Sequence, residues 1–154
     1  MRVKILPIFA VLLGCLMFSA IGCEPDRTTS PILPGEQTVL TITFLPSPVY
    51  EGYSNTYHFT VFIDEVNGVG ARITSMKVED IDSEGNVLYT DQYDENDVVR
   101  TFGTSRIEAY GRLMTSVELE DCFDCARESW LVRVAEDDRG NDVESSQSVE
   151  LISR

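Results

Sequence analysis

Two cysteines three positions apart, Cys122 and Cys125, are the sharpest chemical feature of the chain. In an exported protein, cysteines at this spacing form a local disulfide. A redox-exchange reaction would need a thiol with a lowered pKa, whereas the acidic residues on both sides of this pair would raise it. A zinc site would need two further ligands, and His58 alone cannot supply both. We therefore predict a structural disulfide that pins a long loop between two strands.

Two groups of carboxylates have spacings that a cation could use. Residues 80–86 read Asp-x-Asp-x-Glu-Gly-Asn, which resembles the start of a calcium-binding loop with Asp80, Asp82 and Glu84 as ligands. Position twelve of such a loop is normally a bidentate Glu and is Asp91 in this chain. The second group consists of the carboxylates Asp137 and Asp138 together with the side-chain amide of Asn141. A turn between two strands explains both groups, and a cation site is the alternative.

The chain has one histidine, His58, and no catalytic set surrounds it in the sequence. There is no Gly-x-Ser-x-Gly motif of a serine hydrolase and no phosphate-binding glycine loop. No pair of acids stands out among the 26 carboxylates as it would for glycoside hydrolysis. His58 lies between Tyr57 and Phe59, and we expect it on the exposed face of a strand. We therefore predict a protein that is not an enzyme and holds no cofactor.

The first 22 residues have the composition of an export signal. Arg2 and Lys4 are followed by an uncharged, mainly apolar run from Ile5 to Ile21, and the segment ends in small residues. Because this run is close to the lower limit for a membrane-spanning helix, an uncleaved anchor is an alternative.

The last part of this signal, Ala20-Ile21-Gly22-Cys23, resembles the lipobox of bacterial lipoproteins. The resemblance implies cleavage before Cys23 and lipidation of its thiol, and two or more acyl chains anchor a protein stably to a membrane. Ala20 departs from the leucine that is usual at its position. Ordinary signal cleavage after Gly22 is an alternative. Glu24, the residue after the cysteine, favours the outer membrane in a Gram-negative cell.

A second cysteine, Cys15, offers another lipobox. Leu12-Leu13-Gly14-Cys15 matches the residue pattern more closely than the segment that ends at Cys23. Its apolar run is only about ten residues long, and cleavage there would leave the apolar stretch Leu16–Ile21 on the mature chain. We therefore predict Cys23 as the lipidated residue.

The residues after the signal divide into a tether and a domain. Residues 23–37 contain the predicted lipidated cysteine and three prolines, which favour an extended tether of up to roughly 40 Å. The whole chain carries a net charge of −14, and without Arg2 and Lys4 the mature part carries −16. Such a chain repels nucleic-acid phosphates, so we expect no nucleic acid as a partner.

Residues 38–154 are predicted to form one all-β domain. Apolar and polar residues alternate with a period of two, and turn-forming residues separate the alternating segments. The predicted strands are 38–44, 57–66, 72–81, 87–93, 98–102, 107–109, 112–119, a strand that opens at 130, and 143–152. Seven to nine short strands in about 115 residues favour an antiparallel β-sandwich.

The end of this domain resembles the immunoglobulin-like modules of bacterial envelope proteins. The resemblance rests on the strand count and on the order Trp-x-Val-x-Val, Asp-Asp-x-Gly-Asn and a last strand, Ser148–Ile152. It implies a membrane-displayed interaction or structural module with a protein or glycan partner, in the periplasm or on the cell surface. A cation- or glycan-binding accessory domain of the envelope is the alternative, because fold likeness alone does not fix function.

Overall fold

The computed structural model describes residues 32–53, 55–120, 122 and 124–153. The strands with the clearest alternation form the smaller of two sheets. It contains β1 (Leu40–Leu45), β3 (Thr56–Glu65) and β7 (Arg112–Glu120), which pair antiparallel in the order β1-β3-β7. Every second residue of β1 and β3 is buried, which confirms the faces predicted from the sequence.

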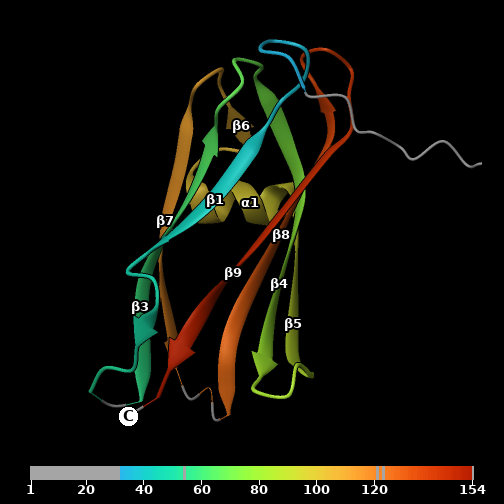
Figure 1. The fold of residues 1–154 in the computed structure, drawn as a ribbon. Coiled ribbons are helices and arrows are strands. Elements are labelled where there is room, and N and C mark those ends of the chain that lie inside the picture. The colour runs from blue at the N-terminus through green and yellow to red at the C-terminus, as the bar shows by residue number, and fades with distance from the viewer. Residues whose placement is uncertain (1–31, 54, 121, 123, 154) are drawn as a thin grey trace, which may run out of the picture. The chain divides into compact units, whose positions relative to one another are not determined.

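The larger sheet contains the remaining strands (Figure 1). Its order is β2 (Val49–Tyr50), β9 (Val143–Ile152), β8 (Cys125–Asp137), β4 (Ala71–Asp82) and β5 (Val87–Asp94), and β6 (Arg106–Ile107) pairs with the first residues of β4. The predicted hairpin between β4 and β5 is present. One pair, β2 with β9, is parallel, whereas the sequence predicted antiparallel strands only.

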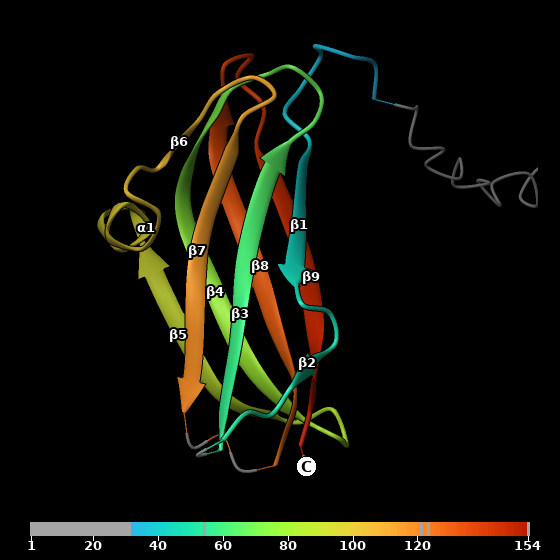
Figure 2. The ribbon, with the colours of Figure 1, turned by 90° about the vertical axis from the view of Figure 1, so that its left-hand side faces the viewer.

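The two sheets pack face to face and enclose the core (Figure 2). Val61 and Ile63 of β3 lie fully buried opposite Ile73 of β4, Val132 of β8 and Val149 of β9. Each such side chain contributes about 1.5–3 kcal/mol by leaving water. The described domain is therefore stabilised mainly between its sheets, as in a sandwich.

Residues 98–102, predicted as a short strand, form part of a helix instead. The helix α1 (Glu95–Phe102) begins after Asp94, whose side chain accepts a hydrogen bond from Asp97 N, while Asp97 accepts one from Asp94 N. This reciprocal capping box gives hydrogen-bond acceptors to two backbone N–H groups at the start of the helix, which have no acceptor within the helix itself. The helix ends at Gly103, which has the positive φ typical of that position.

The connection that carries the cysteines also differs from the prediction. We expected a long loop before a strand that opens at Trp130, but β7 continues to Glu120 and β8 begins at Cys125. The residues before Trp130 pair with β4, so Cys125 itself lies opposite Asp82. The cysteine pair thus lies at the entrance to a strand.

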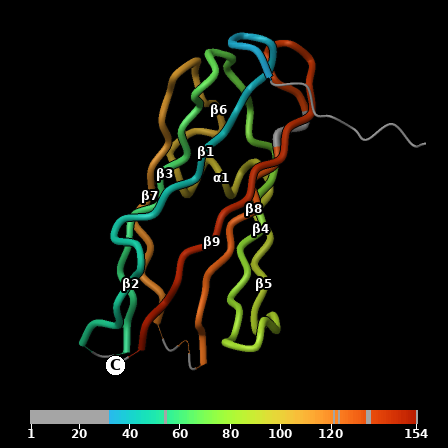
Figure 3. The backbone as a smooth tube through the Cα atoms, viewed as in Figure 1, coloured from blue at the N-terminus to red at the C-terminus, as the bar shows by residue number. Residues whose placement is uncertain are grey.

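The last residues of the predicted tether are attached to the domain. Asn67, between β3 and β4, donates hydrogen bonds to the carbonyls of Leu33 and Gln37 and accepts one from Gly35 N. Thr38 is fully buried. This entry point lies at the opposite end of the domain from the C-terminal end of β9 and the β4–β5 turn (Figures 1 and 3).

The predicted signal, Cys15, Cys23 and Glu24 lie outside the described residues. Within residues 32–153, apart from the gaps given above, no helix is long and apolar enough to cross a membrane.

Candidate functional site

A pocket of about 320 Å³ opens between the edge strands of the two sheets. β5 is the last strand of the larger sheet and β7 the last strand of the smaller one, and both face the same side of the sandwich (Figure 2). The helix α1 contacts β4, β5 and β7 on this side. Its Phe102 packs edge-on against Trp130, with ring centroids 6.4 Å apart. The pocket lies on this side, and Thr101 of the helix is among the residues that line it.

The register of three strands directs carboxylates into this pocket. Asp80 of β4 lies opposite Glu128 of β8, and Val78 lies opposite both Trp130 of β8 and Asp91 of β5. Residues directly opposite one another in a sheet share a face. Since Trp130 is buried in the core, Glu128, Asp80 and Asp91 point toward the space between the sheets as well. Polar residues thus occupy inward positions at one end of the sandwich.

We call this site the acidic pocket and define it by three carboxylates and three aromatic residues: Asp80, Asp91, Glu128, Tyr89, Tyr93 and Trp130. No lysine, arginine or histidine is among the described residues that line it. The one lysine after the predicted signal, Lys77, pairs with Glu79 at 3.0 Å, and both alternate with Asp80 and so lie on the other face of β4. The pocket therefore has a strongly negative character.

Glu128 is the most buried carboxylate of the pocket. Glu128 is only 2% exposed, and its Oε1 accepts a hydrogen bond from Trp130 Nε1. Burial raises the pKa of Glu128 to about 7; the charges of Asp80 and Asp91 add to the increase, and the Trp130 hydrogen bond opposes it. Burial, followed by the charge of Asp91, also raises the pKa of Asp80. Glu128 thus exchanges its proton near neutral pH.

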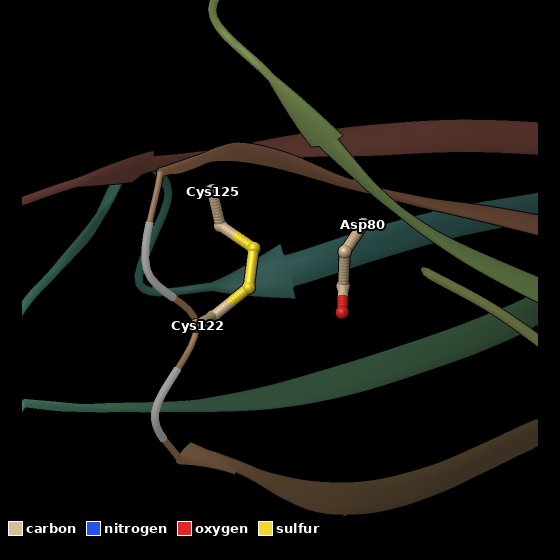
Figure 4. Close-up of side chains that lie close together, drawn as sticks. All are labelled: Asp80, Cys122 and Cys125. Atoms are coloured by element: carbon tan, nitrogen blue, oxygen red, sulfur yellow. A yellow bond between two sulfur atoms is a disulfide. The ribbon is translucent and has the colours of Figure 1, made fainter. Parts of the chain in front are cut away.

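The predicted disulfide partners lie beside this pocket. Cys122 and Cys125 are at disulfide distance, with Cα atoms 5.5 Å apart, and Figure 4 shows their joined sulfur atoms next to Asp80. These three residues are the only group in the described part of the chain whose possible metal ligands lie within 4.8 Å of one another. A cysteine binds a metal as a thiolate, and sulfur atoms that are joined in a disulfide are not thiolates.

His58 lies apart from the cysteines. Its side chain is 60% exposed on the outer face of β3, near Glu118 at 3.8 Å and Thr56 Oγ1 at 3.2 Å. The structure therefore does not bring together the residues that a zinc site would require.

The carboxylates at 80–86 do not converge as a calcium loop would require. Asp82 Oδ1 accepts hydrogen bonds from the backbone of Glu84 and Asn86, and Asp82 Oδ2 accepts one from the Asn86 side chain. Asp82 thus closes the β4–β5 turn, while Asp80 points into the acidic pocket. Glu84 is exposed at the turn.

The second predicted group is likewise occupied by internal contacts. Asp137, 5% exposed, accepts hydrogen bonds from the backbone N–H groups of Thr38, Arg139 and Asn141. Burial would raise the pKa of Asp137, but these donors together lower it. Asp138 forms a bidentate pair with Arg106 at 2.6 and 2.7 Å. These contacts close a turn and join it to the start of the domain.

Two important carboxylates were missed at the sequence level. Glu128 was assigned no role, because its burial follows from the register of β4 and β8 and from the early start of β8. Glu65 was also assigned no role and was simply part of the predicted strand 57–66. It is 2% exposed and accepts backbone hydrogen bonds from four residues: Val39, Asn67, Gly68 and Tyr110. Strict alternation on β3 places Glu65 on the buried face and was the available signal.

Comparison with known proteins supports the architecture. No family model and no curated protein matches the chain. A solved Bordetella pertussis protein provisionally named ApaA is similar over 79% of this chain and 98% of its own, with a TM-score of 0.52 and 13% identity. The fold is a two-sheet, mainly antiparallel β-sandwich.

Two further solved structures are similar to this sandwich at lower scores. A structural-genomics target protein has a TM-score of 0.47 and 14% identity, covering 79% of this chain and 90% of its own. The CARDB domain of PF1109 from Pyrococcus furiosus, solved in complex with di-metal ions, has a TM-score of 0.42 and 12% identity, covering 77% of this chain and 97% of its own.

Proposed function

We propose that this chain is a lipid-anchored cell-envelope protein whose sandwich is a non-enzymatic binding module. The observation that carries the binding role is the acidic pocket, an open site with aromatic walls and uncompensated carboxylates. Specific ligand sites commonly combine apolar walls with a few polar groups. The anchoring role rests on the resemblance of Ala20-Ile21-Gly22-Cys23 to a lipobox.

The position of the chain entry supports display of the pocket. Residues 32–38 enter at one end of the sandwich, whereas the turn after Asp82 lies at the other end (Figure 1). The acidic pocket is on the side of the sandwich, close to that second end, because Asp80 and Glu128 lie near the end of β4 and the start of β8. A tether that holds the domain by its first residues would leave this side accessible to partners.

Of the two binding roles considered for the domain, the pocket favours recognition of a cation. Neutral glycans are bound through hydrogen bonds and stacking and need no buried negative charge. A pocket with three inward carboxylates and no basic residue among its described lining attracts positive charge instead.

Protease shaving with an epitope tag after Arg154 tests the display. Loss of the tag from intact cells would assign the domain to the exterior, and loss only after the outer barrier is permeabilised would assign it to the periplasm. Both outcomes agree with the proposal. A tag that stays protected in both preparations, and is degraded only in lysed cells, would contradict an envelope location.

A further inference from the structure

We propose that the acidic pocket binds an organic ammonium ion, with Glu128, Asp91 and Asp80 facing its charge and the rings of Tyr93 and Trp130 facing its apolar part. This inference rests on the proposed function as a binding module and names the chemistry of its ligand. It draws on the charge, the aromatic lining and the spacing of the carboxylates.

The charge of the pocket calls for a cationic partner. Glu128 is almost fully buried, and the one hydrogen bond that its carboxylate accepts from the described residues comes from the neutral indole of Trp130. A buried carboxylate without a counter-charge is costly, and a bound cation would remove that cost. The arginines nearest in sequence to the helix are engaged elsewhere, Arg100 with Asp97 and Arg106 with Asp138. Because no basic residue is among the described residues that line the pocket, we infer that the cation comes from another molecule.

The aromatic lining favours an organic cation. Buried Trp130 lines the pocket from β8, as Glu128 does, and half-buried Tyr93 and exposed Tyr89 line it from β5. Trp and Tyr rings offer apolar surface to the alkyl part of such a ligand, and a nearby ammonium group is also attracted to their faces. A hydrated metal ion gains no comparable stabilisation from contact with aromatic side chains.

The spacing of the carboxylates excludes a compact metal cage. Calcium needs six to eight oxygen atoms at 2.3–2.6 Å, which places ligand atoms close together. Among the described residues, Asp80, Asp91 and Glu128 do not form a group whose oxygens all lie within 4.8 Å of one another. The pocket, of about 320 Å³, has room for the end of an alkylammonium chain, such as a lysine side chain or a free amine, whose single charge needs no close set of oxygen ligands.

Proton release provides a second signature of binding. The titratable groups that face Glu128 come from two strands: Asp80 from β4, and Tyr89, Asp91 and Tyr93 from β5. Glu118 of β7 lies at the rim of the pocket. The charge of Asp97 on α1 contributes to the raised pKa of Tyr93. Because the pKa of Glu128 is about 7, an ammonium ion that binds its charged form displaces a proton. Affinity should then fall about 20-fold between pH 7.5 and pH 5.5.

The single tryptophan makes the test site-specific, since all indole fluorescence comes from Trp130. Full-length protein purified in detergent is titrated at pH 8 with n-butylammonium, and with n-butanol as the uncharged control. We expect a saturable fluorescence change with the ammonium ion and none with the alcohol. Absence of a saturable change up to 100 mM ammonium would overturn the proposal, as would saturation with calcium chloride alone.

Variants assign the change to the pocket. Glu128→Gln keeps the size of the side chain and the acceptor for Trp130, and it should weaken binding at least tenfold. Asp91→Asn, at an exposed position, serves the same purpose if the first variant does not fold. Glu144 is exposed and forms an ion pair with Arg133, so the control variant Glu144→Gln should bind the ammonium ion like the wild type. Unchanged affinity in folded Glu128→Gln or Asp91→Asn protein would refute the assignment.

The same titration separates two sources of the ammonium group. Equal affinity for n-butylammonium and for a lysine-containing peptide would assign the site to free amines, and at least tenfold tighter binding of the peptide would assign it to a protein partner. Failure of both probes would leave the shaving result unaffected, so the failure of this inference and that of the envelope location are distinguishable.

Discussion

The pKa values of buried carboxylates are shifted in opposite directions at the two ends of this sandwich. Glu65 and Asp137 are surrounded by backbone N–H donors, which together outweigh burial and lower the pKa of each. Glu128 has one neutral donor and two acidic neighbours, so burial dominates and its pKa rises to about 7. At neutral pH the first two residues are charged structural groups, whereas Glu128 is divided between its charged and neutral forms.

The stability of the domain should therefore fall as the pH rises through neutrality. The raised pKa means that the folded state binds the Glu128 proton more tightly than the unfolded state, in which the pKa is near 4.5. The associated stability is fully present below about pH 4.5 and is lost as the pH passes about 7, for a total of about 3 kcal/mol. Urea denaturation at pH 5 and pH 8 measures this loss.

Glu128→Gln provides the control for that pH dependence. The variant cannot ionise at this position, so its free energy of unfolding should change less between pH 5 and pH 8 than that of the wild type. Equal changes in the two proteins would show that another group is responsible.

The substitution Glu65→Gln changes the size of the side chain little, but it should strongly destabilise the domain. In Glu65→Gln an amide NH₂ must face backbone N–H donors that now bond to both carboxylate oxygens. We expect the free energy of unfolding to fall by about 3 kcal/mol in denaturant titration. Glu144→Gln is the matched surface variant and should lose less than about 1 kcal/mol. A loss of similar size in both would contradict the role assigned to Glu65.

The alternation of apolar and polar residues along one strand was enough to predict which residues face the core. It was not enough to predict which residues of different strands lie opposite one another. The inward positions of Tyr57, Phe59, Val61 and Ile63 follow from the sequence and are confirmed. The meeting of Asp80 with Glu128 depends on the register between β4 and β8, which are far apart in the chain. The sequence therefore identified Asp80 as a candidate ligand and assigned it the wrong neighbours.

At the scale of elements, α1 shows how local composition can mislead. Val98 and Val99 are β-branched and favour a strand, which led to the wrong assignment of residues 98–102. The capping pair Asp94 and Asp97 and the terminal Gly103 were the correct signals. Packing decides the outcome, because Val98 is completely buried on one side of the helix.

Loss of the cap should be measurable. Asp94→Ala removes the acceptor for Asp97 N and should lower the free energy of unfolding by about 1 kcal/mol in urea denaturation. Asp142→Ala, at an exposed position outside the helix, should leave stability nearly unchanged. If the two variants unfolded at the same urea concentration, the cap would not stabilise the helix as described.

The cysteine pair makes a similarly modest contribution between β7 and β8. A disulfide that closes so short a ring restricts the unfolded chain little and contributes about 2 kcal/mol. A reducing agent should lower the melting temperature of the wild type and leave that of the Cys122→Ala/Cys125→Ala variant unchanged. A wild-type melting temperature that ignores full reduction, verified by thiol labelling, would show that the bond does not stabilise the domain.

At the scale of the whole molecule, short alternating segments were sufficient to predict a sandwich. The parallel pairing of β2 with β9 could not be predicted, because Val49–Tyr50 is too short to carry a pattern and follows a proline-rich turn. The open side between β5 and β7 could not be predicted either, because the sequence does not show which strands lie at the edges of the sheets. The candidate pocket arises from that open side, so its discovery required the fold.

We propose that a lipid on Cys23 holds this domain at a membrane. Mass spectrometry of the N-terminal peptide of the protein isolated from membranes tests it most directly. The account predicts a chain that begins at Cys23 with a mass increment of two or more acyl chains, and a Cys23→Ser variant without that increment. An unmodified chain that begins at Cys23, a chain that retains Met1, or acylation of Cys15 would contradict it.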